Sequence, residues 1–197
     1  MESQMTVQLS TLPLRVRYHP TIVTNSVANS SLTGGGRCKG GQCGGTTGKP
    51  ALIYVPPGTY SLSSSIQLLI NTQIIGDAIE MPILKAAPSA GKVVVNAHDD
   101  GQPSTNNFYI GIRNIVIDTT SVSPGQEIYG LNWAVSQATN LINVHFLMPV
   151  QSEHVGIEMD VGETGGGSGL FMGDLTFTGG LVGILFSNQQ YAIRNAR

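Results

Sequence analysis

Short segments of alternating apolar and polar residues recur through the second half of the chain, and each carries Asn or Asp at the same place. The segments cover 112–117, 141–146, 171–177 and 192–195. Their shared polar residues are Asn114, Asn143, Asp174 and Asn195, at intervals of 29, 31 and 21 residues. Intervals of roughly 20 to 50 residues are typical of stacked structural repeats rather than of a hairpin sandwich. The pattern therefore predicts a coil of strands.

Alternation within each segment predicts which side chains face the core of this coil. Inward positions are Ile115, Ile117, Val144, Phe146, Leu175 and Phe177, and outward positions are Val116, His145 and Thr176. A sharp corner between sheets needs a left-handed residue, which Asn tolerates better than most, and stacked amides can hydrogen-bond along the axis. We therefore predict an all-β fold, a right-handed parallel β-helix, with a Greek-key sandwich as the structural alternative.

The first half of the chain adds further strands. Residues 50–60 have the pattern of a strand, a Pro-Pro-Gly turn and a return strand, and apolar segments follow at 66–68, 72–76 and 93–95. Residues 1–32 contain two prolines and no clear periodicity. We expect a poorly defined N-terminal segment at 1–33 and one β-helix domain at 34–197.

Composition limits the classes of partner. The chain has 197 residues, of which 41% are apolar and 11% charged, and its formal net charge is −2. This near-neutral surface does not favour nucleic acid as a partner. No apolar segment approaches the roughly 18 to 20 residues of a membrane helix, and no signal peptide is visible at Met1.

A glycine-rich segment at 34–45 contains the two cysteines, Cys38 and Cys43. The strand and helix that flank phosphate-binding glycine loops are not visible beside it, so we predict no nucleotide cofactor. Two cysteines without a second pair or a nearby His do not make a zinc site. We predict that the pair forms a short disulfide in an oxidising compartment, with two free thiols as the alternative.

Acidic residues concentrate between Glu153 and Glu163, beside His154. Glu158 and Asp160 would face the same side of a strand, and inverting hydrolysis of a glycosidic bond needs two carboxyl groups on opposite sides of that bond. A solvated acidic loop is the favoured interpretation, because glycines follow closely and no basic partner is evident. Calcium binding by this pair has no further support, and we predict no metal site.

Several segments together resemble a known family. They are Val-Pro-Pro-Gly-Thr-Tyr at 55–60, Gln-Ile-Ile-Gly-Asp at 73–77, Arg-Asn-Ile-Val-Ile-Asp-Thr-Thr at 113–120, Trp-Ala-Val-Ser-Gln-Ala-Thr-Asn-Leu at 133–141 and Asn-Gln-Gln at 188–190. This set is similar to the N-terminal half of the fungal exo-β-1,3-glucanases of glycoside hydrolase family 55. That half is a pectate-lyase-like β-helix.

The resemblance implies part of a secreted, inverting glycoside hydrolase that acts on β-1,3-glucan in a cleft between two β-helices. In the family, the general acid is a glutamate of the second helix, which would lie outside residues 1–197. We therefore expect one wall of an active site, inactive by itself, in an extracellular protein. A non-catalytic polysaccharide-binding or structural β-helix, and an enzyme like pectate lyase or polygalacturonase, are the alternatives.

Site residues follow from the matching positions. Gln137 and Ser168 match the family's water-positioning groups, and neutral amide and hydroxyl groups can hold a water without competing for the proton of the acid. Trp133, the only tryptophan, would stack on a sugar ring or pack in the core. Gln189 and Gln190 would hydrogen-bond sugar hydroxyls or form an outward amide ladder.

Overall fold

A computed structural model describes residues 50–99, 104–159, 170–187 and 191–197 of the chain. Within these ranges the secondary structure is almost entirely strand. The strands are β1 (Ala51–Val55), β2 (Thr59–Leu62), β3 (Ile66–Gln67), β4 (Thr72–Gly76), β5 (Ile83–Ala86), β6 (Val93–Asn96), β7 (Gly111–Asp118), β8 (Ile128–Asn132), β9 (Asn140–Leu147), β10 (His154–Glu158), β11 (Leu170–Thr178), β12 (Val182–Leu185) and β13 (Tyr191–Ala196), with a 3₁₀ helix, η1, at Ser104–Asn106.

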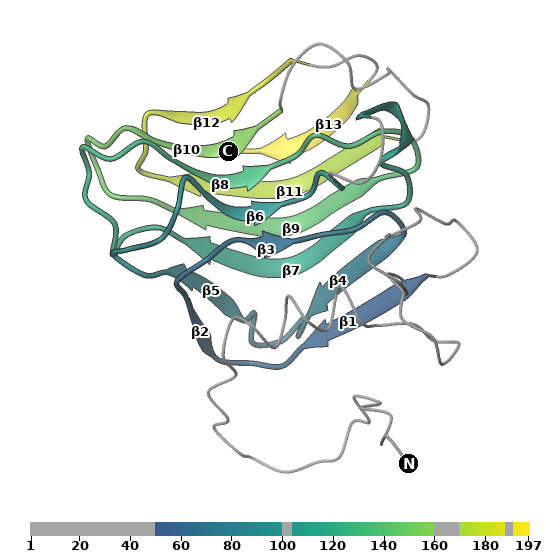
Figure 1. The fold of residues 1–197 in the computed structure, drawn as a ribbon, viewed down its shortest axis with the longest axis horizontal. Helices are drawn as coiled ribbons and strands as arrows, with labels where there is room; N and C mark the ends of the chain where they lie inside the picture. Colours follow the sequence, from purple (N-terminus) through teal and green to yellow (C-terminus); the bar gives the residue numbers. More distant parts are fainter. Residues whose placement is uncertain (1–49, 100–103, 160–169, 188–190) are drawn as a thin grey trace.

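The strands form two parallel sheets in which each turn of the chain lies on the turn before. One sheet runs β1-β4-β7-β9-β11-β13, with β2 and β5 joined to its side, and the other runs β12-β10-β8-β6-β3. Figure 1 shows this stacking, from β1 in blue at the lower edge to β12 and β13 in yellow at the upper edge. Every strand pairing in the described ranges is parallel. The predicted parallel β-helix is confirmed, and the Greek-key alternative is wrong.

The recurrent Asn and Asp residues occupy equivalent corners, as predicted. Asn114, Asn143, Asp174 and Asn195 have φ angles of 55°, 52°, 55° and 54°, within strands that bend at these points. Asn143 Nδ2 donates to Asn114 Oδ1 at 2.9 Å, and Asn195 Nδ2 donates to Asp174 Oδ1 at 2.9 Å. In the two earlier turns a loop separates β1 from β2 and β4 from β5. From β7 onward a single left-handed residue replaces that loop.

The core confirms the predicted inward face. Ile115, Val144 and Leu175 are fully buried, and the rings of Phe146 and Phe177 stack with centroids 5.0 Å apart. Three glycines of the opposite sheet face this aromatic stack. Added Cβ atoms would lie 3.0 Å from Phe146 at Gly130, and 2.7 Å and 3.2 Å from Phe177 at Gly156 and Gly183. Because glycine has no side chain, these three positions leave the space that the two rings fill.

One prediction about the first turn is wrong. β2 does not return along β1, because β1 pairs with β4 and β2 pairs with β5. The segment 56–58 is a corner of the coil, in which Gly58 has a φ of 145° and the Tyr60 hydroxyl donates to the Pro56 carbonyl at 2.8 Å. The Pro-Pro-Gly signal is the same for a hairpin and for a corner, and only long-range pairing separates the two.

Two predictions concern residues outside the described ranges. These are the pairing of Cys38 with Cys43 and the division between an N-terminal segment at 1–33 and a domain at 34–197. Both stay predictions.

Candidate functional site

Gln137 lies at a second left-handed corner, between β8 and β9. Its neighbour Ala138 has a φ of 55°, and Tyr109 and Asn71 have φ angles of 57° on the two preceding turns. The Tyr109 N–H donates to the Gln137 carbonyl at 3.3 Å, so successive corners are linked through the backbone. Gln137 itself is exposed. A fixed backbone therefore presents this amide to solvent.

The residues around Gln137 are buried and hydrogen-bonded. Ser136, Thr139 and Asn107 are at most 1% exposed. The Asn107 N–H donates to Ser136 Oγ at 3.2 Å, the Ser136 N–H donates to the Asn107 carbonyl at 2.9 Å, and Thr139 Oγ1 donates to the Ser136 carbonyl at 3.0 Å. Ser and Thr of the Val-Ser-Gln-Ala-Thr segment thus hold the loop. Gln137 is the residue of this segment that is both polar and free to contact a ligand.

Trp133 does not fit the predicted role in sugar stacking. Its side chain is 1% exposed and belongs to the core, so the chain itself covers the ring. Nearby, burial raises the pKa of the Tyr191 hydroxyl, and the Trp133 indole partly offsets this effect. The core-packing alternative for Trp133 is correct. The sequence left it open because a tryptophan beside polar residues occurs both in cores and on binding faces.

The acidic cluster divides between a strand and undescribed residues. His154 to Glu158 form β10, so the expectation of a solvated loop is wrong for this part. His154 is fully buried, with Nδ1 2.8 Å from Thr119 Oγ1 and Nε2 3.0 Å from the Ser123 carbonyl, which satisfies both ring nitrogens. Glu158 pairs in register with Asn132, at the end of a row of polar side chains. Asp160 and Glu163 lie outside the described ranges.

That row crosses the second sheet with one residue for each turn. Asn96 Nδ2 donates to Gln67 Oε1 at 2.8 Å, and Asn132 Nδ2 donates to Asn96 Oδ1 at 3.0 Å. This row of amides resembles the hydrogen-bonded Asn and Asp residues at the corners of the first sheet. Its members differ in that they lie in strands and have extended backbones. Gln189 and Gln190, the other predicted amide ladder, lie outside the described ranges, as does Ser168.

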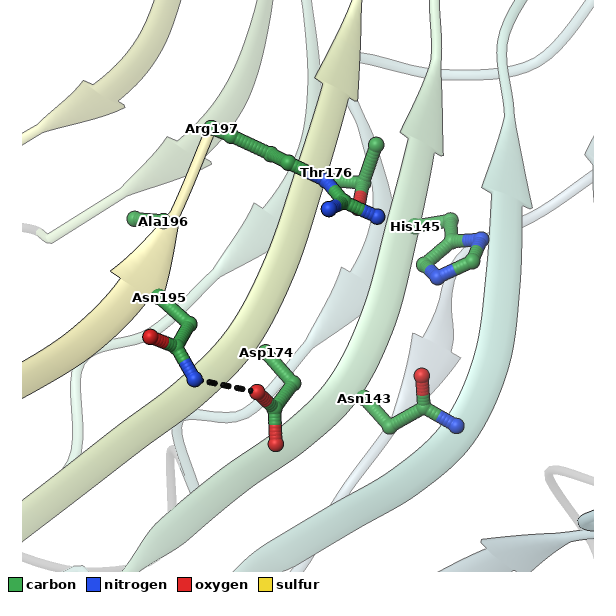
Figure 2. A pocket seen from close by; sticks show the side chains of 7 residues that line it. All are labelled: Asn143, His145, Asp174, Thr176, Asn195, Ala196 and Arg197. Atoms are coloured by element: carbon green, nitrogen blue, oxygen red, sulfur yellow. Dashed lines mark hydrogen bonds between the residues drawn. The ribbon is translucent and has the colours of Figure 1, made fainter.

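A polar pocket of about 300 Å³ lies on the outer surface of the last turns. It is lined by Asn143, His145, Asp174, Thr176, Asn195, Ala196 and Arg197. Figure 2 shows the Arg197 side chain extending across Thr176 toward His145, with Asp174 held by Asn195. The sequence indicates that His145 and Thr176 point outward, but not that they share a pocket. Only stacking of the turns brings these groups together.

Metal binding finds no support in these groups. Within the described part of the chain, no three His, Cys, Asp or Glu side chains are close enough to hold an ion. In the same ranges, no helix is long and apolar enough to cross a bilayer. The groups that line the pocket include amide, hydroxyl, imidazole, guanidinium and carboxylate groups, which can form hydrogen bonds.

Comparison with protein families identifies the fold group. A family model described as rhamnogalacturonase A/epimerase, pectate lyase-like, matches residues 21–197. The chain belongs to this pectate-lyase-like family. The match spans both sheets and both series of corners, so the pectate-lyase-like architecture applies to the whole described part.

Curated relatives of this pectate-lyase-like chain include fungal glucanases. A probable glucan endo-1,3-beta-glucosidase of Arthroderma benhamiae is 42% identical over 178 residues, covering 85% of this chain and 20% of the relative. A glucan 1,3-beta-glucosidase of Cochliobolus carbonum is 37% identical over 179 residues, covering 86% and 22%. A non-secreted LysM effector, LysM15, of Penicillium expansum is 36% identical over 180 residues, covering 86% and 12%.

The names of the two glucanases confirm the resemblance to β-1,3-glucanases that the sequence motifs carry. The chain spans about a fifth of the length of these two relatives. Their names describe proteins far longer than the residues compared.

Proposed function

We propose that this chain forms one wall of the substrate-binding cleft of a glycoside hydrolase that acts on β-1,3-glucan. The names of the relatives support the substrate class. The observation that carries the proposal is the setting of Gln137, an exposed amide on a corner whose neighbouring Ser136 and Thr139 are buried and hydrogen-bonded. Because the backbone on both sides of it is held in place, the Gln137 side chain starts from a fixed point from which its amide can contact a ligand or a water.

Gln137 would hold the water that attacks the anomeric carbon, together with Ser168. A primary amide both donates and accepts hydrogen bonds, so it can orient a water without taking part in proton transfer. Inverting hydrolysis also needs a carboxylic acid on the far side of the glycosidic bond. A second β-helix would supply that acid as a glutamate. A polymer as large as a glucan would be met outside the cell, which favours an extracellular site of action.

Glucose release is the first test. The chain of residues 1–197 is incubated with laminarin, after circular dichroism has verified that it is folded. We expect no release above the rate without protein, because an amide and a hydroxyl cannot protonate the leaving oxygen, and general-acid help is typically worth about 10² to 10⁴-fold. Turnover that disappears in Glu158→Gln would contradict the proposal, because it would place a complete carboxylate site within this chain.

Ligand binding is the second test. Isothermal titration of the same chain should detect binding of laminarihexaose. It should detect no binding of cellohexaose, which differs from laminarihexaose only in its linkage. It should also detect no binding of oligogalacturonate, which tests the uronic-acid alternative. Gln137→Ala should weaken laminarihexaose binding by about threefold to tenfold, as expected for one lost hydrogen bond. Equal affinity for the three ligands, or no binding of laminarihexaose, would overturn the proposed substrate class.

A further inference from the structure

Phe171 is an aromatic side chain on the outer face of β11, close to the corner that carries Gln137. Its neighbours in sequence, Leu170 and Met172, point into the core and are at most 3% exposed, whereas Phe171 is 36% exposed. The Phe171 N–H donates to the Thr139 carbonyl at 3.2 Å. Only Ala138 lies between Thr139 and Gln137 in the sequence, so this contact is close to the Gln137 corner.

Gly173 makes room for the Phe171 ring to lie along the sheet. A Cβ added at Gly173 would lie 2.7 Å from both Cε1 and Cζ of Phe171, which is too close for any real side chain. The far edge of the ring thus occupies the place where the next outward side chain of β11 would begin. The ring forms part of the outer surface instead of standing away from it.

Hydrogen-bonding groups border this ring on the neighbouring strand. Asn140 is the register partner of Phe171 on β9, and its Oδ1 accepts a hydrogen bond from Arg113 Nε at 3.0 Å. This bond orients the planar guanidinium of Arg113 and leaves its terminal N–H groups and the Asn140 amide nitrogen as donors. On the other side, Arg194 of β13 is the register partner of Gly173.

An apolar platform edged by a few fixed donors matches the chemistry of a pyranose ring, which has apolar C–H faces and hydroxyls around its edge. We propose that Phe171, with Arg113 and Asn140, forms a hexopyranose subsite that continues from Gln137 along the outer face of the first sheet. This inference rests on the proposed function and identifies the residues that hold the glucan. It gives Phe171 the stacking role that the buried Trp133 cannot have.

Titration of residues 1–197 with laminarihexaose tests the subsite. Phe171→Ala is expected to raise the Kd by about fivefold to tenfold, in line with the contribution of one aromatic contact. Phe171→Leu should also weaken binding, because it keeps an apolar side chain but removes the flat ring, and Phe171→Tyr should bind like the wild type. Gly173→Ala should weaken binding by pushing the ring off the sheet.

The matched control is Phe186→Ala. Phe186 is 47% exposed, follows β12 of the second sheet and packs edge-on against Tyr191. Its removal should change the Kd by less than about twofold, since a surface phenylalanine outside the subsite contacts no sugar. Thermal unfolding of every variant checks that each one is folded.

The outcomes separate the two proposals. If the wild type binds laminarihexaose and Phe171→Ala binds it equally well, the subsite is overturned and the proposed function stands. Equal losses in Phe171→Ala and Phe186→Ala also overturn the subsite. If the wild type does not bind laminarihexaose, both the proposed function and the subsite fail.

Discussion

Phenylalanine rings lie against glycines in two regions of this molecule. In one region the rings are inside the core, and in the other the ring is on the outer surface. Inside the coil, Phe146 and Phe177 stack on each other and face glycines of the opposite sheet, and Phe146 is 1% exposed. On the outer face, Phe171 lies over Gly173 of its own strand and is 36% exposed. In both regions a missing Cβ provides the space for a ring.

The difference lies in what surrounds each ring. The inner rings are enclosed by two sheets, so water is excluded and removal of a ring leaves a cavity. The outer ring has the sheet on one side and solvent on the other, so less of its contact area contributes to folding. The same local device therefore stabilises the fold in one region and supplies a binding surface in the other.

The largest expected effect is the difference in stability lost on removing the inner and the outer phenylalanine ring. Phe146→Ala should lower the free energy of unfolding by about 3 to 5 kcal/mol, whereas Phe171→Ala should lower it by less than about 1 kcal/mol. Urea denaturation followed by the fluorescence of the single, buried Trp133 measures both. Similar losses for the two variants would show that Phe171 belongs to the core.

An effect of intermediate size on stability is expected to distinguish Gly156 in the core from Gly173 on the outer face. In Gly156→Ala the new Cβ would lie 2.6 Å from the Gly183 carbonyl oxygen, which is part of a paired strand and cannot move freely. We expect a loss of about 1 to 3 kcal/mol. In Gly173→Ala the nearest atoms belong to the ring edge of Phe171, which can rotate toward solvent, and the loss should be below about 1 kcal/mol. The same urea titrations measure both losses, and a larger loss in Gly173→Ala than in Gly156→Ala would contradict the comparison.

The smallest expected effect comes from an ion pair on the outer face. Asp118 lies on the outer face with Lys85 Nζ 2.9 Å from its Oδ2. Burial acts to raise the pKa of Asp118, but hydrogen bonds from Lys85 and Thr120 outweigh it and hold the pKa below its ordinary value. A lowered pKa in the folded state gives stability that is present above the unfolded pKa of about 3.9 and is lost as pH falls through the folded value.

Thermal unfolding between pH 6 and about pH 2.5 tests this dependence. The wild type should lose about 1 kcal/mol or less through this pair, because Lys85 is partly exposed and solvent screens it. Asp118→Asn should be less stable at pH 6 and less sensitive to acid. Glu153→Gln, which changes an exposed carboxylate, is the control and should behave like the wild type. An acid response of Asp118→Asn as steep as that of the wild type would exclude the pair as its source.

The parts of the fold that the sequence predicted are those with a local cause. Asn114, Asn143, Asp174 and Asn195 were recognisable because a left-handed corner restricts the residue type at one position. The inward and outward positions followed from strand alternation. Gln137 could be selected from its segment only through the family resemblance. Its exposure, and the burial of Ser136 and Thr139 beside it, could not be read from three polar residues within four positions.

Amino-acid sequence by itself therefore determined the period of the coil, the identity of its corners and the inner face of its strands. Tertiary structure decided the rest: that β2 pairs with β5 instead of β1, that Trp133 is buried, and that Phe171 is in register with Asn140, which accepts a hydrogen bond from Arg113. The physical reason is distance along the chain. Backbone conformation and alternation act within a few residues, whereas pairing, burial and shared surfaces join side chains that lie about 20 to 40 residues apart in the sequence of a stacked repeat.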